Sequence, residues 1–176
     1  MNDIVEIPSP RGVLRLRPER EDDQAFRYRL FWDSRPELAL LPLEPAMREQ
    51  LMQHQFRAQT VSYRAQFPDA RFDIIELDGA AIGRIVVDRP GSAIHIIDQA
   101  IMPQRRNLGL GSTIMRALMQ EAARAGLPVR LMVSTANDPS QRLYLRLGFV
   151  PIQTGVTHIE LEWRPGSAAT SGASAP

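Results

Sequence analysis

A short segment with two glycines constrains the fold of this chain more than any other feature. Residues 104–113 read QRRNLGLGST, between an apolar, strand-like run at 93–102 and a helix-like run at 110–125. Glycine lets a backbone pass close to an anion. The free N–H groups and the dipole of a following helix attract negative charge. The pattern therefore predicts a phosphate-binding loop.

Two common nucleotide-binding motifs do not fit this loop. A Walker A loop needs a lysine before Ser112 and Thr113, and glycine stands there instead. A GxGxxG dinucleotide motif needs a third glycine where this chain has Ile114. What remains is Arg106-x-x-Gly109-x-Gly111, which by itself indicates only some anion.

Composition narrows the class of protein. The 176 residues suit one domain, and a formal net charge of +1 argues against nucleic acid or a membrane surface as a partner. The absence of cysteine excludes disulfides and a thioester acyl-enzyme, and three scattered histidines predict no metal site. We see no signal-like start and no apolar run near the ~18 residues of a membrane span. We therefore expect a cytoplasmic protein.

Hydrophobic periodicity predicts an α+β domain of mixed layers over residues 13–164. Residues 1–12 are expected to form a loose arm, and residues 165–176 a disordered tail. In the last predicted helix, Asp138 is the expected cap and Pro139 the first helical residue. The predicted strands are 13–17, 71–77, 81–88, 93–102, 129–134 and 156–163, and the predicted helices are 19–31, 46–66, 110–125 and 139–147.

A second motif follows the loop by about 26 residues. It has the form N-x-x-S-x-x-L-Y-x-x-x-G-F and runs from Asn137 to Phe149. Together the two motifs resemble the GCN5-related N-acetyltransferase (GNAT) superfamily. The loop is similar to that family's R/Q-x-x-G-x-G/A pyrophosphate loop, and the second motif is similar to its N-x-x-A-x-x-L-Y-x-x-x-G-F helix. Ser140 in place of alanine is the one small departure.

The resemblance spans roughly residues 13–163 and implies a fold and an activity. The implied fold is a mostly antiparallel sheet, splayed between the fourth and fifth strands, with helices on both faces. The implied activity is transfer of an acetyl group from acetyl-CoA to a primary amine, in a ternary complex and without a metal. The acceptor, a small molecule or a peptide, and a monomeric or homodimeric state stay open. The alternative is a non-catalytic, regulatory acyl-CoA-binding module.

The resemblance also implies roles for individual residues. Ala100, Ile101 and Met102 would pair with the pantetheine arm, and Asn137 would meet the cofactor. Tyr144 would be the general acid that protonates the departing CoA thiolate, since a phenol is protonated near neutral pH. The pyrophosphate would be surrounded by Arg106, Leu108, Gly109, Leu110, Gly111 and Ser112.

The general base is left open between two residues of the strand at 93–102. Some family members carry a glutamate base at the spacing of His95, and Asp98 is the other candidate. Side chains alternate along a strand, so His95 and Asp98 should lie on opposite faces, with Ala100 on the face of Asp98. A water relay is the third possibility.

Acceptor contacts are predicted in the region between the first two helices, which in this superfamily commonly walls the acceptor site. Trp32, Arg35 and Glu37 are the candidates there. The helix face that carries Gln55, Gln59 and Tyr63 is in the same category. A solvated loop with one anchored tryptophan is the competing interpretation, and none of these residues identifies the acceptor.

Overall fold

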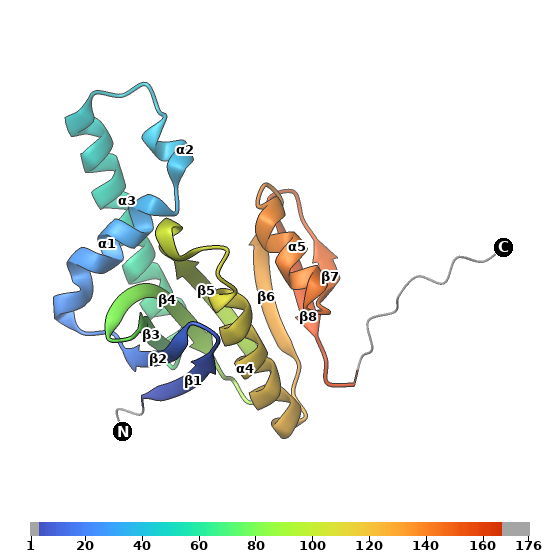
Figure 1. The fold of residues 1–176 in the computed structure, drawn as a ribbon. Coiled ribbons are helices and arrows are strands. Elements are labelled where there is room, and N and C mark those ends of the chain that lie inside the picture. Colours follow the sequence, from blue (N-terminus) through green and yellow to red (C-terminus); the bar gives the residue numbers. More distant parts are fainter. Residues whose placement is uncertain (1–3, 167–176) are drawn as a thin grey trace. The chain divides into compact units, whose positions relative to one another are not determined.

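The computed structural model describes residues 4–166, which fall into two compact units. The first unit comprises Met1–Asp88 and Asp98–Gly111, and the second comprises Arg89–Ile97 and Ser112–Pro176. Strand β5 and helix α4 each run from one unit into the other. Figure 1 labels the helices and strands along the chain.

Four antiparallel strands form the sheet of the first unit. They are β1 (Val5–Ser9), β2 (Gly12–Pro18), β3 (Arg71–Leu77) and β4 (Ala80–Asp88), each paired with the next. Asp78 and Gly79 link β3 to β4 with φ of 51° and 80°. Positive φ at both positions is what a two-residue hairpin turn requires, which explains the Asp-Gly sequence.

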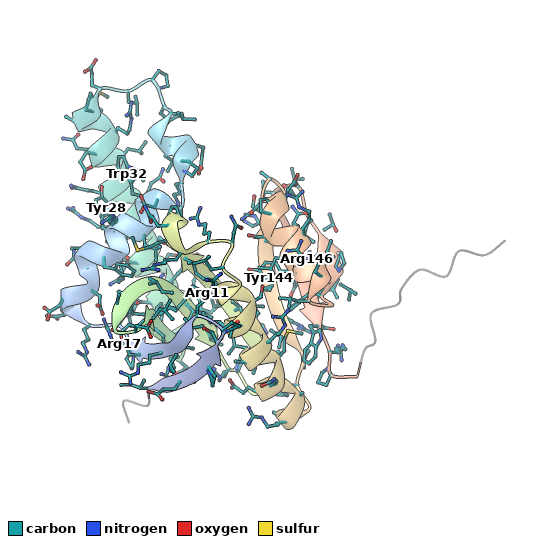
Figure 2. The ribbon with its side chains drawn as sticks, in the orientation of Figure 1. Arg11, Arg17, Tyr28, Trp32, Tyr144 and Arg146 are labelled. Atoms are coloured by element: carbon teal, nitrogen blue, oxygen red, sulfur yellow. The ribbon has the colours of Figure 1, made fainter. Side chains whose placement is uncertain are left out.

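The helices of the first unit pack through aromatic side chains. They are α1 (Gln24–Asp33), the short α2 (Pro36–Ala39) and the long α3 (Pro45–Gln66). Phe31 of α1 and Phe56 of α3 are buried, with ring centroids 5.5 Å apart in an edge-on arrangement. Tyr28 and Trp32, labelled on α1 in Figure 2, pack against the same cluster. This geometry is favourable for aromatic pairs and locks α1 onto α3.

The second unit contains the parallel part of the sheet. Strand β5 (Ile94–Ile101) pairs in parallel with β6 (Val129–Ser134) through Ile94–Ile96 and Val129–Leu131. Strands β8 (His158–Trp163) and β7 (Val150–Thr154) continue it in antiparallel fashion. Its helices are α4 (Leu110–Ala125) and α5 (Asp138–Arg146).

The whole sheet has eight strands in the order β1-β2-β3-β4-β5-β6-β8-β7. The predicted fold class, a mostly antiparallel sheet with helices, is therefore confirmed. The parallel pair of β5 with β6 joins the fourth and fifth strands that the sequence predicts. Within residues 4–166, no helix is long and apolar enough to cross a membrane.

Three short elements were not expected from the sequence. Strand β1 lies in the segment 1–12 that was expected to be a loose arm, where Pro8 interrupts the alternation. Helix α2 lies in a proline-rich stretch, and every residue of β7, which contains Pro151, is exposed. Such edge or surface elements bury too little to leave a hydrophobic pattern.

Smaller corrections concern the ends of elements. The first helix begins at Gln24, because Glu21–Asp23 form a 3₁₀ turn (η1) instead. Asn137, not Asp138, caps α5: its side chain accepts the N–H of Ser140 at 3.2 Å. Of the predicted tail, residues 165–166 form a turn and residues 167–176 lie outside the described part.

Gly83 gives a test of how closely β4 and β5 approach in the first unit. A Cβ at Gly83 would overlap the carbonyl oxygen of Ala100 and lie 3.3 Å from Cα of Ile101. We expect Gly83→Ala to lower the free energy of unfolding by about 1–3 kcal/mol, because one strand must shift. Urea denaturation measures this change.

Gly111→Ala is the matched control. There the added Cβ would make ordinary contacts, 3.5 Å from Cδ1 of Ile101 and 3.6 Å from Nε2 of Gln99. Since alanine is the better helix former, its stability should be unchanged or slightly higher. Equal stability of both variants would contradict the close approach of β4 and β5.

Candidate active site

The glycine loop follows β5 and is held against it. After the 3₁₀ turn η2 (Pro103–Arg105), the guanidinium Nε of Arg106 donates to the carbonyl oxygen of Ile101 at 2.9 Å. The amide Nε2 of Gln99 donates to the carbonyl oxygen of Gly111 at 3.4 Å. These two contacts anchor both ends of the loop to the same strand.

The backbone of the loop fits the expected close approach of an anion. Asn107 and Gly109 have φ of 60° and 78°, and the space beside Gly109, where a Cβ would stand, is open. Arg106, Asn107 and Gly109 are exposed, and α4 begins at Leu110. Backbone N–H groups in such a turn at a helix start are suited to a phosphate.

A cavity of about 40 Å³ lies within the first unit, between α1, α3 and the strands β4 and β5. Both charged and aromatic side chains line it. They are Arg27, Leu30, Phe31, Ser34, Arg35, Phe56, Gln59, Thr60, Arg84, Asp98 and Ala100.

A buried ion network forms one wall of this cavity. Arg84 donates from Nη1 to Oδ2 of Asp98 at 3.1 Å and from Nη2 to Oε2 of Glu19 at 3.2 Å. The side chains of Glu19 and Arg84 are only 2% and 8% exposed, whereas that of Asp98 is 27% exposed. Asp98 is thus the member of the network that stays accessible from the cavity it lines.

Burial controls the protonation of the groups in this region. It raises the pKa of the Asp98 carboxyl above its ordinary value, and the neighbouring charges of Arg84 and Arg35 offset this only in part. Burial likewise raises the pKa of the Tyr63 hydroxyl and lowers that of the Arg35 guanidinium. A carboxyl with a raised pKa is a better proton acceptor than an ordinary aspartate.

The structure brings several of the predicted residues together and separates others. Asp98 and Ala100 line the cavity with Arg35 and Gln59, as expected for one face of β5 and one face of α3. Glu37 is exposed on α2 and is not part of the lining, and Trp32 packs with the aromatic cluster.

Sequence reasoning missed three charged residues around this cavity: Glu19, Arg27 and Arg84. Arg84 carried a usable signal, because it interrupts the apolar run AAIGRIVV of β4. A charge at a buried strand position requires an opposite charge nearby.

The remaining candidates lie in the second unit. Tyr144 on α5, labelled in Figure 2, is half-buried, with its ring centroid 5.8 Å from that of Phe149. His95 is half-buried on β5, in register with Arg130 of β6. The side-chain oxygen of Asn137 is engaged in capping α5.

Comparison with known families decides the class of protein. The acetyltransferase (GNAT) family matches residues 18–149, three quarters of the chain. The chain belongs to the GNAT acetyltransferase family. No curated protein matches it in sequence.

Solved structures of GNAT proteins share its fold. The PaiA N-acetyltransferase from Thermoplasma acidophilum, solved with coenzyme A, aligns with a TM-score of 0.65 at 16% identity, covering 86% of this chain and 98% of that one. Ard1 from Thermoplasma volcanium aligns at 0.60 and 20% identity, covering 86% and 97%. A GNAT family acetyltransferase from Elizabethkingia anophelis with acetyl-CoA bound aligns at 0.51 and 14% identity, covering 58% and 82%.

The raised pKa of Asp98 predicts a pH dependence of stability. Since burial favours the protonated form, the folded protein holds this proton more tightly than the unfolded chain. The stabilisation of the folded state by this proton is complete below the ordinary carboxyl pKa of about 4. It is lost as the pH rises through the raised pKa of Asp98. Urea denaturation from acidic to neutral pH should show this decline in the wild type.

Asp98→Asn removes the titrating group and serves as the comparison. Its free energy of unfolding should lack that decline, whatever its absolute stability. If the free energies of unfolding of wild type and Asp98→Asn changed with pH in the same way, the raised pKa of Asp98 would be contradicted.

Proposed function

We propose that this GNAT protein transfers an acetyl group from acetyl-CoA to a primary amine by direct attack in a ternary complex. The observation that carries the proposal is the cavity in the first unit. It offers a carboxyl with a raised pKa, Asp98, on the same face of β5 as Ala100. In the sequence comparison, this strand is the one that would pair with the pantetheine arm.

The glycine loop is the proposed pyrophosphate site. Arg106, Leu108, Gly109, Leu110, Gly111 and Ser112 would hold it, mostly through backbone N–H groups. Ile101 and Met102, with Ala100, complete the cofactor-binding set, and Asn137 remains a candidate contact. Acetyl-CoA supplies the acetyl group as a thioester.

The proposed chemistry needs two proton transfers by side chains. Asp98 accepts a proton from the attacking amine, and burial, which raises its pKa, makes its carboxylate a stronger base than an ordinary aspartate. Tyr144 donates its phenolic proton to the departing thiolate, as the resemblance implies. His95 is the second candidate for the base, but it is not among the residues that line the cavity.

Tyr144→Phe tests the acid role. Loss of a general acid typically costs 10²–10⁴-fold, so we expect kcat to fall by about 10²-fold or more while acetyl-CoA binding is retained. Thiol release with a panel of primary amines measures the rate, and calorimetry measures cofactor binding.

Tyr28→Phe is the matched control. The hydroxyl of Tyr28, on α1, donates to Oε1 of Glu49, on α3, at 2.7 Å. Its removal should lower the stability only slightly and leave kcat unchanged. Equal activity of Tyr144→Phe and wild type would assign the acid role elsewhere. Tight acetyl-CoA binding without turnover of any amine would favour a non-catalytic, regulatory acyl-CoA-binding module.

Gly111→Val tests the proposed pyrophosphate site. Gly111 lies in the first turn of α4, where a Cβ would already be at contact distance from Ile101 and Gln99, and valine adds two methyl groups beyond that Cβ. We expect the Kd for acetyl-CoA to rise by at least about tenfold, measured by calorimetry. Ala123→Val, at an exposed position of the same helix, controls for a β-branched residue in α4. Unchanged affinity in Gly111→Val would place the pyrophosphate elsewhere.

A further inference from the structure

Arg35 stands out among the charged residues of the cavity in the first unit. Its guanidinium carbon lies 3.7 Å from the centroid of the Phe31 ring, and Nη1 donates to the carbonyl oxygen of Phe31 at 3.3 Å. No carboxylate of residues 4–166 forms an ion pair with it within 4.0 Å. A half-buried guanidinium with no counter-ion is expensive unless an anion joins it.

The other arginines around the cavity form ion pairs with the carboxylates present. Arg27 lies 2.8 Å from Oε1 of Glu19, although the angle is poor for a hydrogen bond, and Arg64 lies 3.7 Å from the same oxygen. Arg84 takes the other oxygen of Glu19 and pairs with Asp98. Three arginines thus share two carboxylates and Arg35 pairs with neither, so the charges of this group of residues sum to an excess of positive charge.

Arg35 and Asp98 are placed to hold the two ends of one small molecule. Both line the same cavity, and the charge of Arg35 acts on the Asp98 carboxyl, yet the two groups form no ion pair within 4.0 Å. The cavity between the surrounding side chains, about 40 Å³, exceeds the roughly 10–15 Å³ that one water needs, so small polar groups can enter it between Arg35 and Asp98.

We propose that the acceptor is a small primary amine that carries a carboxylate, with the amine directed at Asp98 and the carboxylate bound by Arg35. This inference rests on the proposed acetyl transfer and names its substrate class. The planar guanidinium of Arg35, with its carbon 3.7 Å from the centroid of the Phe31 ring, is suited to charge-assisted hydrogen bonds with a carboxylate. The positive excess disfavours polyamines and other polycations as acceptors.

Two sources can supply this amine and carboxylate: a free amino acid, or the N-terminal residue of a peptide with an acidic side chain. The first comparison measures kcat/KM for glycine, β-alanine and 4-aminobutyrate against the corresponding amides, which keep the amine and lack the carboxylate. The second measures kcat/KM for peptides with N-terminal Asp against the same peptides with N-terminal Asn. A charge-assisted pair predicts a preference for the carboxylate of about tenfold to a hundredfold. A preference among the free amino acids would identify a free amino acid as the acceptor, and a preference among the peptides would identify a peptide N-terminus.

Arg35→Gln separates this contact from a general loss of structure. It should raise KM for the carboxylate acceptor at least about tenfold more than KM for the matched amide. Arg35→Lys should restore part of the preference, and acetyl-CoA affinity should be retained. Arg29→Gln, at an exposed arginine of the neighbouring helix α1, is the matched control and should keep the preference. Equal use of carboxylate and amide, or an equal loss of both in Arg35→Gln, would overturn the proposal.

Failure of the proposed function has a different signature. If acetyl-CoA binds but no amine is acetylated, calorimetry can still measure whether the same amino acids and amides bind in the cavity. Binding of an amino acid that Arg35→Gln abolishes would support the amine-carboxylate site without the transfer reaction. Absence of any such binding would overturn it.

Discussion

The buried guanidinium of Arg84 is the interaction on which the rest of the first unit depends. Its side chain is 8% exposed, and removing such a charge from water costs several kcal/mol unless it is paired. Glu19, just after β2, and Asp98, on β5, supply the two carboxylates. The backbone N–H of Glu19 also bonds the carbonyl oxygen of Phe72, which secures the pairing to the sheet. The ion network therefore links β4 and β5 to the segment that follows β2, and it forms one wall of the cavity.

The same burial raises the pKa of Asp98, the proposed base. Loss of water around the carboxyl outweighs the attraction of Arg84, so the pKa is raised although a cation is in contact. Glu19 is held by Arg84, Arg27 and Arg64, and its negative charge opposes ionisation of Asp98. Arg35 is left without a carboxylate, which connects the electrostatics of the fold to the proposed choice of acceptor.

Much of the framework was predictable because it leaves local patterns. The strand at Arg71–Leu77, the helix at Leu110–Ala125 and the strand at Val129–Ser134 have the predicted bounds, since their buried faces repeat at the period of the element. Strands β1 and β7 were missed because they lie at the edges of the sheet. Their residues are mostly exposed, so no hydrophobic period marks them.

The sequence alone determined the family and the position of the glycine loop, because two motifs with fixed spacing are local properties of the chain. Strand alternation also placed His95 and Asp98, the two candidate side chains for the base, on opposite faces, with a water relay left open. Only the tertiary structure decided that Asp98 lines a cavity with Arg35 and Arg84. Those residues come from β5, the turn between α1 and α2, and β4. Contacts so distant along the chain have no period that a sequence can display. The partners that bury Asp98, and so raise its pKa, exist only after folding.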